Sequence, residues 1–126
     1  MLVDLRAGRN DGFDRVVFEF SYGTPGYNVR YEPLPVFQDP SYRPIALTAD
    51  HALVVAMFPA AGHDEQGRVL YPVPERLTVA FPAIREIVAR GDFEGYLSFV
   101  LGINGLRSFR VSTLDSPPRV VIDVAT

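Results

Sequence analysis

The chain has 126 residues, of which 48% are hydrophobic and 21% are charged, so it is long and apolar enough to fold as one domain around a core without disulfide bonds. Its formal net charge of −3 and its scattered basic residues, all of them arginine, argue against a nucleic-acid surface. The absence of cysteine excludes disulfides, thiolate metal ligands and cysteine nucleophiles.

Short segments that alternate between apolar and polar residues run along most of the chain. Alternation with period two indicates β-strands, and the prolines and glycines suit the turns between them. Residues 33–44 are rich in proline, which cannot donate to a sheet, so an edge or a crossover is predicted. Residues 52–58 are continuously apolar, which predicts a strand buried on both faces. The predicted strands are residues 2–7, 13–20, 27–32, 45–48, 52–58, 76–81, 96–101, 108–114 and 119–124, and a loop is predicted over residues 59–74.

Residues 15–20 (RVVFEF) recur near the C-terminus as residues 119–124 (RVVIDV). One hypothesis pairs the two segments as antiparallel neighbours with Val17 opposite Val121. In that register opposite charges face each other on both sides of the valines, and each such pair stabilises a sheet by roughly 0.2–1 kcal/mol. The alternative places the two strands in different packed sheets, related by a pseudo-twofold axis. The predicted charge pairs are Arg15 with Asp123 and Glu19 with Arg119.

Residues 82–91 (PAIREIVARG) are ambiguous. A proline near the start, a glycine at the end, and apolar Ile84, Ile87 and Val88 between them suit a short helix. Strand alternation is weaker here than elsewhere. Local signals therefore favour one short helix near residues 82–90 in an otherwise all-β chain.

Seven to nine short strands, with turn signals about every 8–12 residues, are typical of a β-sandwich or barrel. We predict a two-sheet β-sandwich in a single domain over residues 1–126, since no linker or shift in composition divides the chain. The predicted core residues are Val16, Phe18, Phe20, Val55, Leu97, Phe99, Val120, Ile122 and Val124.

Aromatic and polar side chains concentrate between residues 22 and 43. Tyrosine combines an apolar ring with a polar tip, and sugars present apolar C–H faces edged by hydroxyls, so exposed tyrosines beside arginines would suit a glycan. A protein partner would explain the same composition, because Tyr and Arg are enriched at interfaces. Tyr27 and Tyr31 could instead cap the core from a strand, whereas Tyr22 and Tyr42 fall in predicted loops. The candidate ligand-binding residues are Tyr22, Tyr27, Tyr31, Tyr42, Arg30 and Arg43.

A second candidate is the polar loop His63, Asp64 and Glu65, because imidazole and carboxylates can bind divalent metals. His51 is the only other histidine and no histidine pair has a ligand spacing, so a solvated turn closed by Asp64 is the favoured alternative. No serine–histidine–acid arrangement or phosphate-binding loop is present. The sequence therefore predicts no catalytic residue, no metal site and no cofactor.

Five segments are residues 13–20 (FDRVVFEF), 62–67 (GHDEQG), 91–95 (GDFEG), 102–105 (GING) and 115–123 (DSPPRVVID). Together they resemble the AMIN-like domain, which occurs in actinobacterial envelope proteins, often lipoproteins. The resemblance covers essentially the whole chain. AMIN domains proper are β-sandwiches that target cell-wall amidases and secretin-type channels to the envelope, in the amidases by binding peptidoglycan, and this chain matches them at its Arg-Val-Val-x-acid strands.

The resemblance implies a non-catalytic β-sandwich module of the cell envelope, with a strand rather than a helix over residues 82–91. It supplies no ligand residues. We expect the module to bind peptidoglycan or another cell-wall glycan; the alternative is a protein-interaction or structural module of an envelope complex, using an exposed sheet edge or an apolar patch. The chain shows no transmembrane segment and no signal peptide, so a cytoplasmic location stands as the alternative to the envelope.

Overall fold

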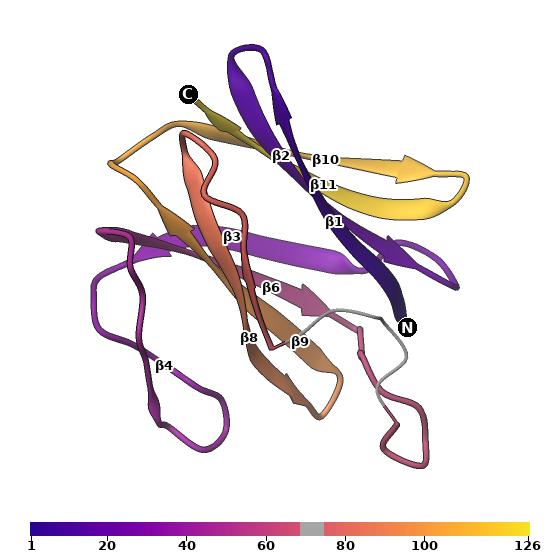
Figure 1. The fold of residues 1–126 in the computed structure, drawn as a ribbon. Coiled ribbons are helices and arrows are strands. Elements are labelled where there is room, and N and C mark those ends of the chain that lie inside the picture. Colours follow the sequence, from indigo (N-terminus) through magenta and orange to yellow (C-terminus); the bar gives the residue numbers. More distant parts are fainter. Residues whose placement is uncertain (69–74) are drawn as a thin grey trace.

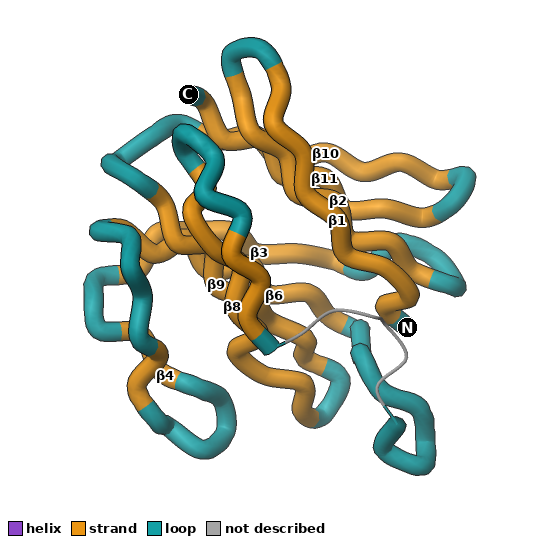
Figure 2. The backbone as a smooth tube through the Cα atoms, in the orientation of Figure 1, coloured by secondary structure: helices purple, strands orange, loops and turns teal. Residues whose placement is uncertain are grey.

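The computed structural model describes residues 1–68 and 75–126, so part of the predicted loop over residues 59–74 lies outside the described residues. All regular elements of the described part are strands, which confirms the all-β prediction (Figures 1 and 2). None of these residues forms a helix long and apolar enough to cross a membrane. The strands are β1 (Leu2–Asn10), β2 (Phe13–Phe20), β3 (Gly26–Glu32), β4 (Val36–Phe37), β5 (Pro44–Ile45), β6 (His51–Phe58), β7 (Arg76–Thr78), β8 (Ile84–Phe93), β9 (Tyr96–Ile103), β10 (Phe109–Asp115) and β11 (Pro118–Ala125).

Two sheets face each other and form the predicted sandwich. One has four strands in the order β1-β2-β11-β10, and the other has five in the order β3-β6-β9-β8-β7. The β4–β5 hairpin forms a separate two-stranded ladder beside the five-stranded sheet (Figure 1). The strand pairs of the described residues are antiparallel, an arrangement that lets each sheet bury one face and leave the other accessible.

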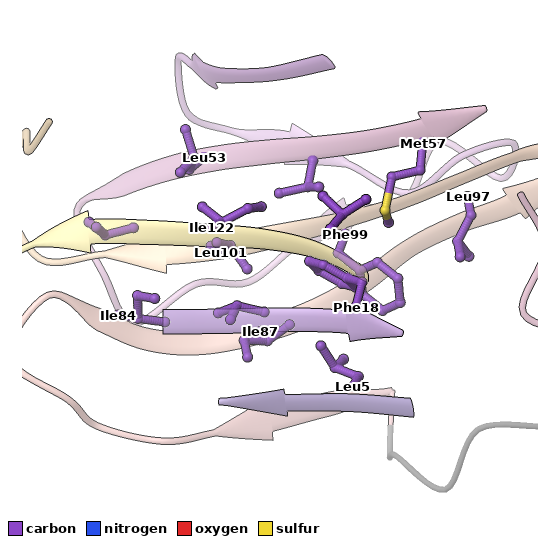
Figure 3. Close-up of a cluster of buried hydrophobic side chains, with 14 of the residues drawn as sticks. Leu5, Phe18, Leu53, Met57, Ile84, Ile87, Leu97, Phe99, Leu101 and Ile122 are labelled. Atoms are coloured by element: carbon purple, nitrogen blue, oxygen red, sulfur yellow. The ribbon is translucent and has the colours of Figure 1, made fainter. Parts of the chain in front are cut away.

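The core fills the space between the two sheets, as the close-up in Figure 3 shows. Phe18 of β2 and Phe99 of β9 meet there from opposite sheets, with ring centroids 5.1 Å apart. Ring pairs at this separation stabilise a core beyond the area that they bury. The predicted core residues all belong to this cluster, so the prediction of the core is confirmed.

The two copies of the repeated sequence lie side by side in the four-stranded sheet. β2 and β11 are antiparallel neighbours, and Val17 is opposite Val121. The first hypothesis is therefore confirmed in its register, and placement in different sheets is wrong. This ladder joins the second strand of the chain to the last one and places β2 between β1 and β11.

One of the two predicted charge pairs forms. Arg15 and Asp123 lie opposite each other, with 2.7 Å between the Arg15 Nε and the Asp123 Oδ1. Glu19 lies opposite Arg119, but its carboxylate pairs with Arg6 of β1 at 3.0 Å. β1 flanks β2 on the edge away from β11, so Glu19 has two arginines in competition.

The local prediction of a helix near residues 82–90 is wrong, and the strand implied by the family resemblance is confirmed. β8 pairs with β9 and β7, and its register shifts between Ile84 and Glu86. A bulge inserts one residue into a strand, so the next inward position moves from Glu86 to Ile87. Ile84 and Ile87 are both buried in the core at a spacing of three, which imitates the spacing of a helix.

A second, smaller apolar cluster lies on the outer face of the five-stranded sheet. Val36 and Ile45, from the proline-rich segment predicted as an edge or a crossover, cover this face with the β4–β5 hairpin. Leu53 and Val55 of β6 face the sandwich core, while Val54 faces the hairpin. The prediction of a strand buried on both faces over residues 52–58 is therefore confirmed along most of that length.

Candidate functional site

A groove lies between the β4–β5 hairpin and the β7–β8 side of the five-stranded sheet. Its volume of about 590 Å³ is within the range of small-molecule sites. The hairpin contributes amide, hydroxyl and guanidinium groups, and the sheet contributes a carboxylate, a second guanidinium and an apolar side chain. The lining residues are Gln38, Ser41, Arg43, Pro44, Ile45, Ala46, Glu75, Arg76 and Val88.

Hydrogen bonds anchor the hairpin wall of this groove to β8. The Asp39 N–H donates to the Arg90 carbonyl at 3.0 Å, and the Arg90 Nε donates to the Phe37 carbonyl at 3.0 Å. Within the turn, the Gln38 N–H donates to the Arg43 carbonyl at 2.7 Å. The polar groups on the turn are therefore presented by a wall that is fixed to the sheet.

Tyr42 occupies the turn of the hairpin, between the lining residues Ser41 and Arg43, and is 75% exposed. Its φ of 62° lies in the left-handed region, where bulky residues are uncommon. The Tyr42 N–H donates to the Gln38 carbonyl at 3.0 Å, and its ring meets the edge of Phe37 at a centroid distance of 5.1 Å. Backbone strain of this kind clusters at ligand-binding loops, which makes the Tyr42 turn the leading candidate for a binding site.

A buried carboxylate beneath the groove organises its sheet side. Glu86 is 1% exposed; its Oε1 accepts the Thr48 N–H at 2.7 Å, and its Oε2 lies 3.0 Å from the Arg76 Nη1. The Arg76 Nη2 donates to the Ala46 carbonyl at 2.6 Å. A buried charge needs such partners, so Arg76 is engaged in neutralising Glu86. Gly102 makes room for this carboxylate, because a Cβ there would lie 2.8 Å from the Glu86 Cγ.

The predicted tyrosines do not share one surface. Tyr22 is 88% exposed in the β2–β3 loop, and Tyr22 and Tyr42 are thus both exposed as predicted. That loop and the β4–β5 hairpin lie on opposite sides of the molecule (Figure 1). Tyr27 is 47% exposed on β3. Tyr31 is partly buried and its hydroxyl donates to the Arg107 carbonyl at 2.6 Å, which supports the core-capping alternative for Tyr31.

The two predicted arginines differ in their surroundings. Arg30 of β3 has its Nη2 2.7 Å from the Glu32 Oε2, and its Nη1 donates to the Asn28 Oδ1 at 2.5 Å. These contacts occupy Arg30 on its own strand. Arg43 is the member of the predicted set that lines the groove among the described residues, and Tyr42 precedes it in the turn.

Asp64 of the predicted polar loop closes its own turn. The Gln66 and Arg68 N–H groups both donate to its Oδ1 at 2.9 Å, and the Arg68 Nε lies 2.7 Å from its Oδ2. These contacts, the Arg68 N–H foremost, hold the pKa of Asp64 below its usual value. This arrangement is the solvated turn that the sequence analysis favoured.

The other two residues of that loop point to different partners. The His63 Nδ1 lies 2.6 Å from the Asp92 Oδ2, and Glu65 is exposed. In residues 1–68 and 75–126, no group of three or more histidine and acidic side chains is arranged to hold a metal ion. The polar loop therefore does not gather into one site.

An aromatic shelf, formed by Phe58 of β6 and Tyr96 of β9, was missed by sequence reasoning. The two rings stack with centroids 4.3 Å apart, and both are about half exposed. Gly26 lies opposite Phe58 on the neighbouring strand β3. Because Gly26 has no side chain, an apolar hollow of about 250 Å³ remains between the shelf, Tyr27 and Ala56. This hollow is a second candidate contact surface.

Gly91 of β8 allows the hairpin wall to approach the sheet closely, because a Cβ there would lie only 2.6 Å from the Asp39 carbonyl oxygen. Gly91→Ala is expected to displace the hairpin and to lower the free energy of unfolding by about 1–3 kcal/mol. Faster amide exchange at Asp39, followed by NMR, measures this displacement. Gly8→Ala is the matched control, because its Cβ would meet only Asn10 at 4.0 Å. Unchanged exchange at Asp39 would contradict the role given to Gly91.

Comparison with known proteins identifies the family of the chain. A search of curated proteins finds no significant match. A family model described as the AMIN-like domain matches residues 1–126, which is the whole sequence. The chain therefore belongs to the AMIN-like domain family.

Proposed function

We propose that this protein is a non-catalytic module of the cell envelope that binds peptidoglycan or another cell-wall glycan through the groove beside Tyr42. The AMIN-like family suggests a cell-envelope-related module and an extracytoplasmic or envelope location. The observation that carries the choice of ligand is the combination, on one anchored hairpin, of an exposed tyrosine ring with the polar side chains of Gln38, Ser41 and Arg43.

These groups match the surface of a sugar. A ring face accepts the apolar C–H side of a pyranose, and amide, hydroxyl and guanidinium groups exchange hydrogen bonds with its hydroxyls. Among the described residues that line the groove, Glu75 is the one carboxylate and histidine is absent. Glycoside hydrolysis ordinarily needs two carboxyl groups flanking the bond, so this lining supports binding rather than catalysis.

Tyr42→Ala is expected to weaken the binding of the full chain to isolated peptidoglycan about two- to tenfold, because an aromatic face contact contributes about 0.5–1.5 kcal/mol. Co-sedimentation over a range of peptidoglycan concentrations measures the change. Tyr22→Ala is the matched control: it makes the same truncation at an exposed tyrosine on the other side of the molecule. An equal loss in both variants would show that the groove is not the binding surface, and no saturable retention of the parent would refute glycan binding.

The aromatic shelf favours a second candidate function, a protein-interaction or structural module of an envelope complex. β3 lies at the end of its sheet and pairs only with β6 among the described strands. A free edge can accept an added strand, and the hollow beside Phe58 could receive an apolar side chain from it. Capture of an identified envelope protein that is lost in Phe58→Ser, with no retention on peptidoglycan, would favour this function over glycan binding.

A further inference from the structure

Two charged side chains on the groove lining have no ion-pair partner within the described part of the chain. Arg43 lies on the hairpin side of the groove, and Glu75 is the residue immediately before β7. The guanidinium of Arg76 is already committed to the buried carboxylate of Glu86. Among the described lining residues, the groove therefore presents one unpaired cation, Arg43, and one unpaired anion, Glu75.

This pair of charges restricts the ligands that fit. A ligand with only a carboxylate is attracted by Arg43 and repelled by Glu75. A ligand with only an ammonium group is attracted by Glu75 and repelled by Arg43. A molecule with both groups satisfies both side chains at once. Arginine offers a planar fork that binds a carboxylate through two hydrogen bonds, and a carboxylate accepts from an ammonium. Gln38 and Ser41 can complete the contacts of either group.

We propose that the groove binds a zwitterionic ligand, namely a free amino acid or the end of a diamino-acid side chain that carries both a carboxylate and an ammonium group, with Arg43 holding the carboxylate and Glu75 the ammonium. This inference rests on the proposed function for the origin of the ligand, because the peptide stems of peptidoglycan carry such ends. Arg43 and Glu75 would bind the carboxylate and the ammonium group of a free amino acid in the same way, so small molecules can test the proposal directly.

The test is an NMR titration of the full chain with three related probes that share a five-carbon chain and differ in the charged groups on it. Diaminopimelic acid carries carboxylates and ammonium groups, pimelic acid carries only the carboxylates, and 1,5-diaminopentane carries only the ammonium groups. Diaminopimelic acid is expected to cause saturable shifts at amides of the groove, with an affinity about fivefold or more above that of either other probe. Equal affinity for pimelic and diaminopimelic acid, or no saturable shift at the groove, would overturn the proposal.

Variants assign the two roles. Arg43→Gln and Glu75→Gln are each expected to bring the affinity for diaminopimelic acid down to that of a single-charge probe. Arg43→Lys keeps the charge but loses the fork and should retain part of the binding, while Tyr22→Ala should bind as the parent does. If neither glutamine variant changes the affinity, the assignment is wrong.

The outcome is separate from that of the proposed function. Saturable binding of diaminopimelic acid without retention on peptidoglycan would keep the zwitterion site and reject cell-wall binding. Retention that depends on Tyr42, without binding of diaminopimelic acid, would keep the glycan function and reject the zwitterion site. If diaminopimelic acid releases the retained protein from peptidoglycan, the zwitterion site and the surface that binds the cell wall are the same.

Discussion

Phe18→Ala is expected to lower the free energy of unfolding by about 3–5 kcal/mol, the typical cost of removing a buried phenylalanine ring. Phe18 is fully buried between the sheets, where its ring meets that of Phe99 (Figure 3). The truncation removes both the transfer free energy of the ring and the contacts of its neighbours, which cannot collapse from two sheets into the cavity. Because ordinary domains are stable by about 5–15 kcal/mol, this loss would leave the variant marginal.

Urea denaturation of the parent and the variant, followed by circular dichroism, measures the loss. Phe93→Ala is the matched control, because it removes the same ring from a position that is 49% exposed, and it should cost less than about 1 kcal/mol. The slope of the unfolding free energy against urea should stay constant, so that the midpoint alone moves. A Phe18→Ala variant that unfolds at the midpoint of the parent would place Phe18 outside the core.

The alternation of single strands was sufficient to predict the core, whereas the repeated segment left two arrangements open, of which the structure shows the antiparallel pairing. Residues 15–20 repeat at residues 119–124 with the same order of charges, and opposite charges favour the antiparallel alignment that the structure shows. The Phe18 and Ile122 side chains face inward because the period-two alternation places them on the apolar face of their strands. Where period two runs without interruption, the sequence determines which face of a strand is buried.

β8 shows where this reasoning fails. Its bulge after Ile84 replaces the spacing of two by a spacing of three, so local rules favour a helix over residues 82–90. The bulge lies in the pairing of β8 with β9, and the local pattern of residues 82–90 does not contain that inter-strand register. The family resemblance corrected the prediction because it refers to the whole fold rather than to one segment.

The candidate site could be predicted only in part for a related reason. Tyr42 and Arg43 were found because they are neighbours in the sequence. Glu75 lines the same groove from the residue before β7, and this placement depends on the order β9-β8-β7 in the sheet and on the hairpin that covers it. Phe58 and Tyr96 form a shelf only because β6 and β9 are adjacent. Contacts between strands can be predicted only when the order of the strands in the sheet is known, and the period-two pattern of a single strand does not contain that order.

Asp14→Ala is expected to lower the free energy of unfolding by roughly 2–5 kcal/mol, because it orphans two buried N–H groups that each cost about 1–3 kcal/mol. Asp14 lies in β2 and is fully buried. Its Oδ2 accepts the Ala83 N–H at 2.7 Å and the Ile84 N–H at 3.0 Å, at the start of β8 in the opposite sheet. This carboxylate is therefore a polar tie between the two sheets, inside a core that is otherwise apolar.

Asp14→Asn is the matched variant for this tie. Its amide oxygen can still accept a hydrogen bond, so we expect a smaller loss than in Asp14→Ala, and urea denaturation of both variants measures the difference. Amide exchange at Ala83 and Ile84 should accelerate in Asp14→Ala before the rest of the sheet opens, because these N–H groups lose their acceptor. β8 also carries Val88, which lines the groove. Asp14→Ala should therefore weaken the binding of a ligand in the groove, although Asp14 is not itself a lining residue. Equal stability of parent and Asp14→Ala, or unchanged exchange at both amides, would mean that the sheets are held by apolar packing alone.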